Sequence, residues 1–336
     1  MQFELRQQVI EPLRQTFTPL VARYGDRSAT RYEEGSIGIQ STEHFHYRPL
    51  WDPQHEIYDT DYSALKLTDP DAYTDPRQFY YTPYVINRAA LHEAFGRNLT
   101  YVVDRGLLGK MPQGWQDLVA KTVLPLRYYE SGAQLLNVEG GRFAYGTTVE
   151  QVFTYASFDR IGNAQILSRI GMALGDNSDA VLATTKPAWM DDQGLQGLRR
   201  LVEELLVNPD WAVANVGLDL CDRLLFPLLT VHLDEAALLG GAGAYSLLIQ
   251  QLGVWWADQR KWFDPLIKAW VTDPEHGKNN TEVLQATVKK IMPQASAAVT
   301  DLARDMDSLA DTGAVAFVAA TVDKVHETLR AMGIEA

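Results

Sequence analysis

The pattern that most constrains the fold is a helical repeat of apolar residues that continues from residue 76 to the C-terminus. In the stretch 146–174, for example, Val149, Val152 and Phe153 recur at three- and four-residue spacing and would form one side of a helix. Glycines and prolines separate the repeats. The pattern predicts helices at residues 76–105, 112–138, 146–174, 192–207, 209–238, 243–271, 281–310 and 314–332. We therefore predict an all-α fold built from long helices.

Residues 1–75 differ from the rest, because their prolines break any helical period and favour extended conformations. We predict an extended arm with one short helix near residues 8–23. Asp75 is predicted to cap the first long helix, with Pro76 at its first position. The aromatic residues of the arm have no core of their own, so the arm should lie over another surface. We favour a partner's surface over the chain's own helices, and we divide the chain into this partner-wrapping arm and a helical domain at 76–336.

Charge and cysteine content exclude several classes of protein. The chain has 43 acidic and 30 basic residues and a net charge of −13, so it should repel phosphate backbones, and nucleic acid is not expected as a ligand. One cysteine rules out an internal disulfide and agrees with a reducing compartment. We see no signal peptide and no apolar run long enough to span a membrane. The expected location is the cytoplasm.

Two of the predicted helices carry segments that look like metal-binding motifs without their ligands. The segments are Phe158–Gln165 and Trp256–Lys261. In a carboxylate-bridged di-iron bundle, two helices each present Glu-x-x-His on one side, and two more helices each add one Glu. Here Arg160 and Asn163 take the Glu and His positions of the first segment, and Asp258 and Lys261 take those of the second. Fixed positive charge at these positions predicts a bundle that folds without the metal.

Longer strings of sequence carry a more specific signal. They are Phe45–Glu56, Thr74–Tyr81, Leu167–Gly171 and Gln196–Arg200. In these strings the chain resembles the β subunit of the hydroxylase component of bacterial multicomponent di-iron monooxygenases, most closely the phenol hydroxylase type. The resemblance implies a ferritin-like bundle of long helices that is a paralogue of the iron-bearing α subunit.

The resemblance also implies a role, partners and cofactors. The implied role is a non-catalytic structural β subunit that supports O2-dependent aromatic hydroxylation in α. The implied partners are the α and γ subunits, in two copies each of α, β and γ, together with a regulatory protein and a reductase. The implied cofactors lie outside this chain: a di-iron centre in α, and NADH, FAD and an iron–sulfur cluster in the reductase. No membrane partner is implied.

Other functions stay open on the sequence alone. The same role in a toluene, alkene, propane or cyclic-ether monooxygenase fits equally well, because substrate choice would reside in α. A stand-alone ferritin-like oxidase or iron-storage protein would need the ligands that this chain lacks. A free helical adaptor without an enzyme partner is the third alternative.

The family pattern can be followed position by position. The lone Glu of the third ligand helix falls near Cys221, and that of the fourth falls at Glu130. Carboxylates thus remain only at Glu130 and Asp258, beside Arg160 and Lys261. Two ferric ions need several anionic oxygens, so we expect buried salt bridges here and no metal bound by this chain.

The remaining candidate sites have weaker support. His46 completes one Glu-x-x-His match with Glu43, but there is no second copy, so a surface or interface histidine is expected. A thiolate at Cys221 would be a nucleophile only beside a base, and its apolar helix favours an inert buried side chain. The glycine-rich stretch 239–243 follows a predicted helix and lacks the lysine of a phosphate loop. The tryptophans Trp255, Trp256 and Trp262 are expected to fill the core rather than line a pocket.

Tyrosine, tryptophan and arginine are enriched at protein interfaces, and two stretches of the chain contain them. One stretch lies in the arm and the other at the start of the first long helix. The residues predicted to meet a partner are His46, Tyr47, Trp51, Tyr80, Tyr81, Tyr84 and Arg88.

Overall fold

The computed structural model describes residues 17–25, 27–41, 50 and 52–335. These residues form helices, turns and loops, and the described ranges contain no β-strand. The α-helices are α1 Thr18–Tyr24, α2 Arg31–Glu34, α3 Tyr81–Asp104, α4 Gln113–Leu118, α5 Leu126–Phe143, α6 Thr147–Leu174, α7 Ala180–Asp191, α8 Gln193–Leu206, α9 Trp211–Pro227, α10 Leu233–Leu239, α11 Gly243–Val271, α12 Gly277–Ala310 and α13 Ala314–Ala331. No helix among the described residues is long and apolar enough to cross a membrane.

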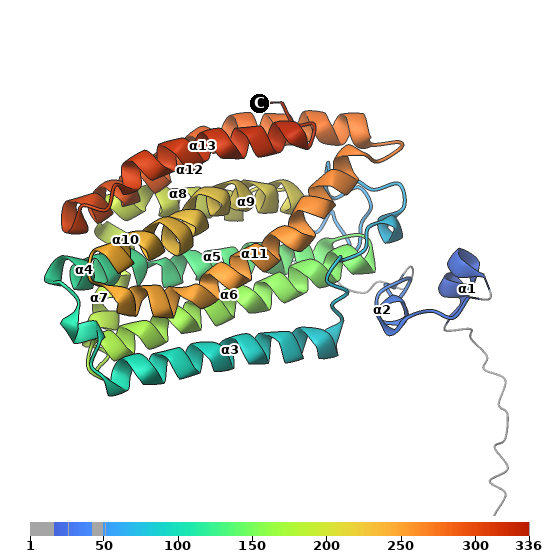
Figure 1. The fold of residues 1–336 in the computed structure, drawn as a ribbon. Coiled ribbons are helices and arrows are strands. Elements are labelled where there is room, and N and C mark those ends of the chain that lie inside the picture. Colours follow the sequence, from blue (N-terminus) through green and yellow to red (C-terminus); the bar gives the residue numbers. More distant parts are fainter. Residues whose placement is uncertain (1–16, 26, 42–49, 51, 336) are drawn as a thin grey trace, which may run out of the picture.

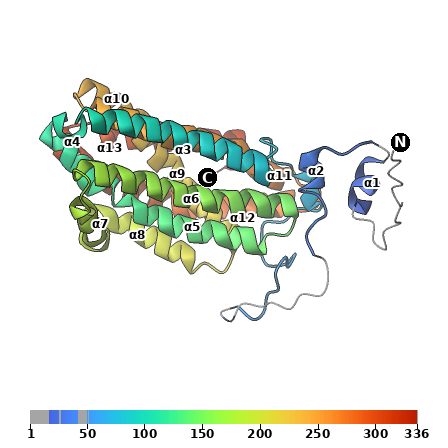
Figure 2. The same ribbon diagram turned by 90° about the horizontal axis from the view of Figure 1, so that it is seen from below.

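The long helices lie side by side as one bundle, with α12 and α13 along one edge and α3 along the opposite edge (Figure 1). Seen from below, α3, α6 and α5 lie next to one another (Figure 2). Helix α5 packs most extensively on α6, and α9 and α11 complete the interior around them. A Cβ at Gly140 would lie 2.6 Å from the ring of Phe153, so glycine allows the close approach of α5 to α6.

The helix boundaries correct several predictions. The first long helix begins at Tyr81 and not at Pro76, because Gln78 adopts a left-handed backbone conformation, with a φ of 53°, that a helix does not accommodate. The Asp75 carboxylate accepts hydrogen bonds from the backbone and side chain of Arg77 in the turn before it. The predicted helices 112–138 and 209–238 are each interrupted by one π-helical turn, at Val119–Val123 and Leu228–His232. The helix α7 was missed, because its sequence carries no strong apolar stripe.

The described part of the arm packs on its own chain. Tyr32 accepts a hydrogen bond from the backbone of Asp75 at 2.7 Å, Gln40 donates to the Ala144 carbonyl at 2.8 Å, and Tyr73 donates to the Trp262 carbonyl at 3.0 Å. These residues therefore contact the chain's own helices, and the contact of the arm with a partner stays a prediction. The predicted short helix appears as α1, and the part of its range before residue 17 lies outside the described residues.

Candidate functional site

The interior of the bundle holds a buried ion cluster where the sequence predicted vestigial ligand positions. Arg160 of α6 has no exposed surface and donates to Glu130 of α5 at 3.3 Å. It also pairs with Asp222 of α9, with one N–O distance of 3.4 Å. Asn163 donates its amide to the second oxygen of Glu130 at 3.3 Å. We call Glu130, Arg160, Asn163 and Asp222 the Arg160 cluster, and it joins three helices.

The electrostatics of the Arg160 cluster follow from its burial. Burial disfavours the charged guanidinium, but Asp222 and Glu130 outweigh it and raise the pKa of Arg160 above its usual value. Burial raises the pKa of Glu130 to about 7, against the opposing effect of Arg160. The pKa of Asp222 is also raised by burial, and Tyr129 donates to this carboxylate at 2.7 Å. Arg160 is thus a fixed cation between two buried acids.

These residues do not fit a di-iron centre. Such a centre takes four carboxylates and two imidazoles, whereas the cluster offers two carboxylates, an amide and a guanidinium. The α9 carboxylate is Asp222 and not the predicted position Cys221. Throughout the described ranges, no group of three or more His, Cys, Asp or Glu side chains is arranged to hold a metal ion.

Asp258 does not join the Arg160 cluster and does not depend on Lys261, contrary to our expectation. It accepts from Arg88 at 2.7 Å and from Arg77 at 3.1 Å, and Lys261 lies 3.7 Å away with 64% of its side chain exposed. Arg88 also binds Asp159 of α6 at 2.7 Å. Burial alone would raise the pKa of Asp258, but Arg77 and Arg88 outweigh it and lower the pKa. From α11 it is Trp255 that faces Arg160, 4.8 Å from the guanidinium.

Because of this geometry, Asp258 and Lys261 should contribute unequally to the stability of the fold. We expect Asp258→Ala to lower the free energy of unfolding by about 1–2 kcal/mol, because two largely buried guanidinium groups each lose one charged hydrogen bond while Arg77 keeps Asp75 and Arg88 keeps Asp159. Lys261→Ala should change it by less than about 0.5 kcal/mol, since the lysine is exposed. Denaturant unfolding of both variants measures the difference. Equal losses would contradict the assignment of Arg77 and Arg88 as the partners of Asp258.

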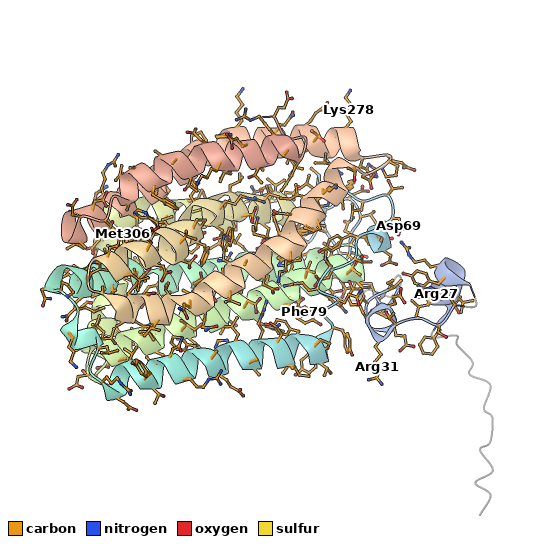
Figure 3. All side chains as sticks on the ribbon, in the orientation of Figure 1. Arg27, Arg31, Asp69, Phe79, Lys278 and Met306 are labelled. Atoms are coloured by element: carbon orange, nitrogen blue, oxygen red, sulfur yellow. The ribbon has the colours of Figure 1, made fainter. Side chains whose placement is uncertain are left out.

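The predicted interface residues divide into three groups. Tyr84 and Arg88 are buried between α3, α6 and α11, so their assignment to a partner surface was wrong. Phe79, labelled in Figure 3, lies beside Arg88, whose guanidinium is 5.6 Å from its ring. Tyr81 is 70% exposed and Tyr80 is half-buried, so both remain accessible. The arm residues His46, Tyr47 and Trp51 lie outside the described residues.

Comparison with known proteins decides the family. The sequence profile of the methane/phenol/alkene hydroxylase family matches residues 51–274. The chain belongs to this hydroxylase family. The resemblance seen in the sequence strings is therefore confirmed, and both degenerate ligand segments lie inside the matched region.

Individual relatives of this hydroxylase-family chain agree. It is 35% identical over 311 residues to the phenol 2-monooxygenase oxygenase component DmpL of Pseudomonas sp. (strain CF600), covering 92% of this chain and 93% of the relative. It is 24% identical over 242 residues to the hydroxylase component subunit beta of the toluene-4-monooxygenase system of Ectopseudomonas mendocina, covering 70% and 72% of the two chains. A solved phenol hydroxylase from Pseudomonas sp. OX1 matches with a TM-score of 0.89 and 31% identity over 99% of each chain. The predicted all-α, ferritin-like long-helix bundle is confirmed.

Sequence reasoning missed a second buried network in this hydroxylase-family chain. Asp219 of α9 accepts from Arg223 at 2.7 Å and pairs with Arg260 of α11, and both arginines also pair with Asp264. The available signal was the run Asp219–Arg223, which places three charges inside an apolar helix. Buried charges need partners, so that run could have predicted ion pairs with a neighbouring helix.

The buried core positions agree with the inert roles expected from the sequence. Cys221 is fully buried, and burial raises the pKa of its thiol to about 12, which disfavours the nucleophilic thiolate. Trp255 and Trp262 are 2% and 0% exposed and pack inside the apolar core. Trp256 is only partly buried and lines a groove with Arg260 and Phe317, so the expectation was wrong for this residue.

A pH dependence follows from Glu130. Its folded-state pKa of about 7 lies above the usual 4.5, so the folded chain keeps a proton that the unfolded chain releases, and stability should fall as the pH rises between these values. Burial raises the pKa of Glu139 to about 7 as well. We expect Glu130→Gln and Glu139→Gln each to flatten the fall, and Glu204→Gln, at an exposed site, to leave it unchanged. Urea unfolding across this pH range measures it, and a wild-type stability that rises with pH would contradict the prediction.

Proposed function

We propose that this chain is the non-catalytic β subunit of the hydroxylase component of a phenol-type multicomponent monooxygenase. The observation that carries the proposal is the buried guanidinium of Arg160, ion-paired to Glu130 and Asp222 where an active paralogue would have ligands. The name of the 35%-identical relative, an oxygenase component of phenol 2-monooxygenase, supports the substrate class. The name of the toluene relative supports the subunit assignment.

In this proposal the chemistry belongs to the partner α subunit. A di-iron centre there would insert one oxygen atom of O2 into an aromatic C–H bond, with electrons from NADH through the FAD and iron–sulfur cluster of a reductase. The β chain would add no reacting group. Its buried ion pairs would tie α5, α6, α9 and α11 together and present a rigid helical surface to α and γ.

The surface proposed for this contact lies on α5 and α6. Leu135, Phe158 and Ile161 are 50%, 48% and 47% exposed, and a groove between these helices is lined by Val138 and Phe158. Large apolar side chains at this exposure favour a protein interface. The arm residues His46, Tyr47 and Trp51 are proposed to reach the same partner complex, in the cytoplasm.

Co-expression with candidate α and γ subunits tests the proposal. The expected result is a complex with two copies each of α, β and γ that hydroxylates phenol when the reductase and regulatory protein are added. A chain that purifies alone as a stable monomer in the presence of these subunits would contradict it. Activity on toluene but not on phenol would support the structural role and would show that the substrate class is toluene and not phenol.

A further inference from the structure

The Arg160 cluster has the form of a cation site that is already filled. Oxygen atoms of Glu130 and Asp222 converge on one guanidinium, and the Asn163 amide donates a hydrogen bond to the other oxygen of Glu130. The rings of Trp255 and Phe226 lie 4.8 and 5.5 Å from the guanidinium carbon and enclose it. The cation comes from the chain itself and has no exposed surface.

The Arg160 cluster holds two acids for one guanidinium, and the Arg160 Nε has no hydrogen-bond partner in the described part of the chain. Burial raises the pKa of Glu130 to about 7, so near neutral pH this acid can keep a proton beside Arg160. A divalent ion in place of the guanidinium would displace that proton and meet two carboxylates. Two carboxylates and one imidazole would give a zinc-like ion three protein ligands, with a water in the fourth position.

We infer that Glu130, Asp222 and Asn163 form a cation site from which the Arg160 guanidinium excludes metal, and that a divalent ion binds there once Arg160 is shortened. The side chain occupies the space between the carboxylates and holds both of them by hydrogen bonds, so an entering ion would have to displace a tethered, fully buried charge. This inference goes beyond the proposed function and does not depend on it, because it concerns the residues of this chain alone.

A consequence is that the chain resists metal loading even in excess metal. Two buried acids on neighbouring helices would otherwise offer an anionic site to stray divalent ions. Arg160 keeps this resistance at every physiological pH, because its guanidinium does not lose its charge.

Cobalt binding by the full-length chain tests the inference. The variant Arg160→Ala/Asn163→His removes the guanidinium and supplies an imidazole beside the two acids. The matched control adds Glu130→Gln and Asp222→Asn, which keeps the space but removes the anionic oxygens. Each protein is refolded with and without Co2+ and desalted, and then its bound cobalt, visible absorption and thermal unfolding are measured.

We expect roughly one cobalt ion per chain in the first variant, with a Tm that rises with cobalt concentration. The wild-type chain and the matched control should bind none at this site. Failure of the first variant to fold with cobalt present, or a folded variant that binds none, would overturn the inference. Equal binding by the matched control would overturn it too, because the site would then not use Glu130 and Asp222.

Discussion

Arg160→Met should lower the free energy of unfolding by about 3–5 kcal/mol, the largest effect of any single substitution considered for this chain. Methionine fills much of the space but leaves Glu130 and Asp222 as buried acids without a cation. Their remaining partners, the amide of Asn163 and the hydroxyl of Tyr129, carry no charge. Guanidinium chloride unfolding of the full chain measures the loss.

Two controls separate the lost charge from lost packing. Arg200→Met removes an exposed arginine, 81% exposed and paired with Glu204, and should leave the free energy of unfolding essentially unchanged. The triple variant Arg160→Met/Glu130→Gln/Asp222→Asn removes the unpaired charges and should regain most of the stability. If the triple variant is as unstable as Arg160→Met, packing and not ion pairing explains the effect.

Phe158→Asp is expected to weaken assembly with the α subunit by roughly thirtyfold, which corresponds to the about 2 kcal/mol typical of an aromatic residue central to an interface. Phe158 is 48% exposed on α6, so an aspartate there can stay hydrated in the free chain and should not unfold it. In a closed interface the same carboxylate would be buried without a partner. Sizing of the co-expressed complex and titration of the isolated subunits measure the change.

The control for this variant is Leu239→Asp at the end of α10, where an even more exposed leucine lies away from the α5–α6 face. It should leave assembly unchanged. If both variants assemble like the wild type, the α5–α6 face is not the contact surface. Loss of assembly in both would point to a general sensitivity to added charge.

The fold could be predicted from the sequence because it depends on local periodicity. The 3.6-residue apolar stripe of 146–174 reappears as α6 with nearly the same ends, and the same holds for α11 and α13. The π turns after α4 and α9 could not be foreseen, since one extra residue in a helical turn leaves the composition unchanged. The start of α3 was predicted too early, because the sequence does not show that Gln78 adopts the left-handed backbone conformation that interrupts a helix.

The ion clusters were only half predictable. The predicted ligand positions identified Arg160 and Glu130 as a buried pair, and both side chains do lie in the bundle interior. It did not identify Asp222, which lies one residue after the expected position on α9. Asp258 was assigned to the nearby Lys261, whereas its actual partners are Arg77, just before α3, and Arg88 of α3. Partners distant in sequence depend on packing that no local pattern encodes.

The measurement that tests the central claim most directly is the iron content of the assembled hydroxylase when this chain carries Glu130→Gln, Asp222→Asn and Asp258→Asn. These substitutions keep side-chain size and remove the carboxylates from the Arg160 cluster and its neighbour. If the chain is a non-catalytic β subunit, iron per complex and hydroxylase activity per assembled complex should equal those of the wild type. Iron lost in proportion to the substituted chain would contradict the account and would make this chain a metal-binding subunit.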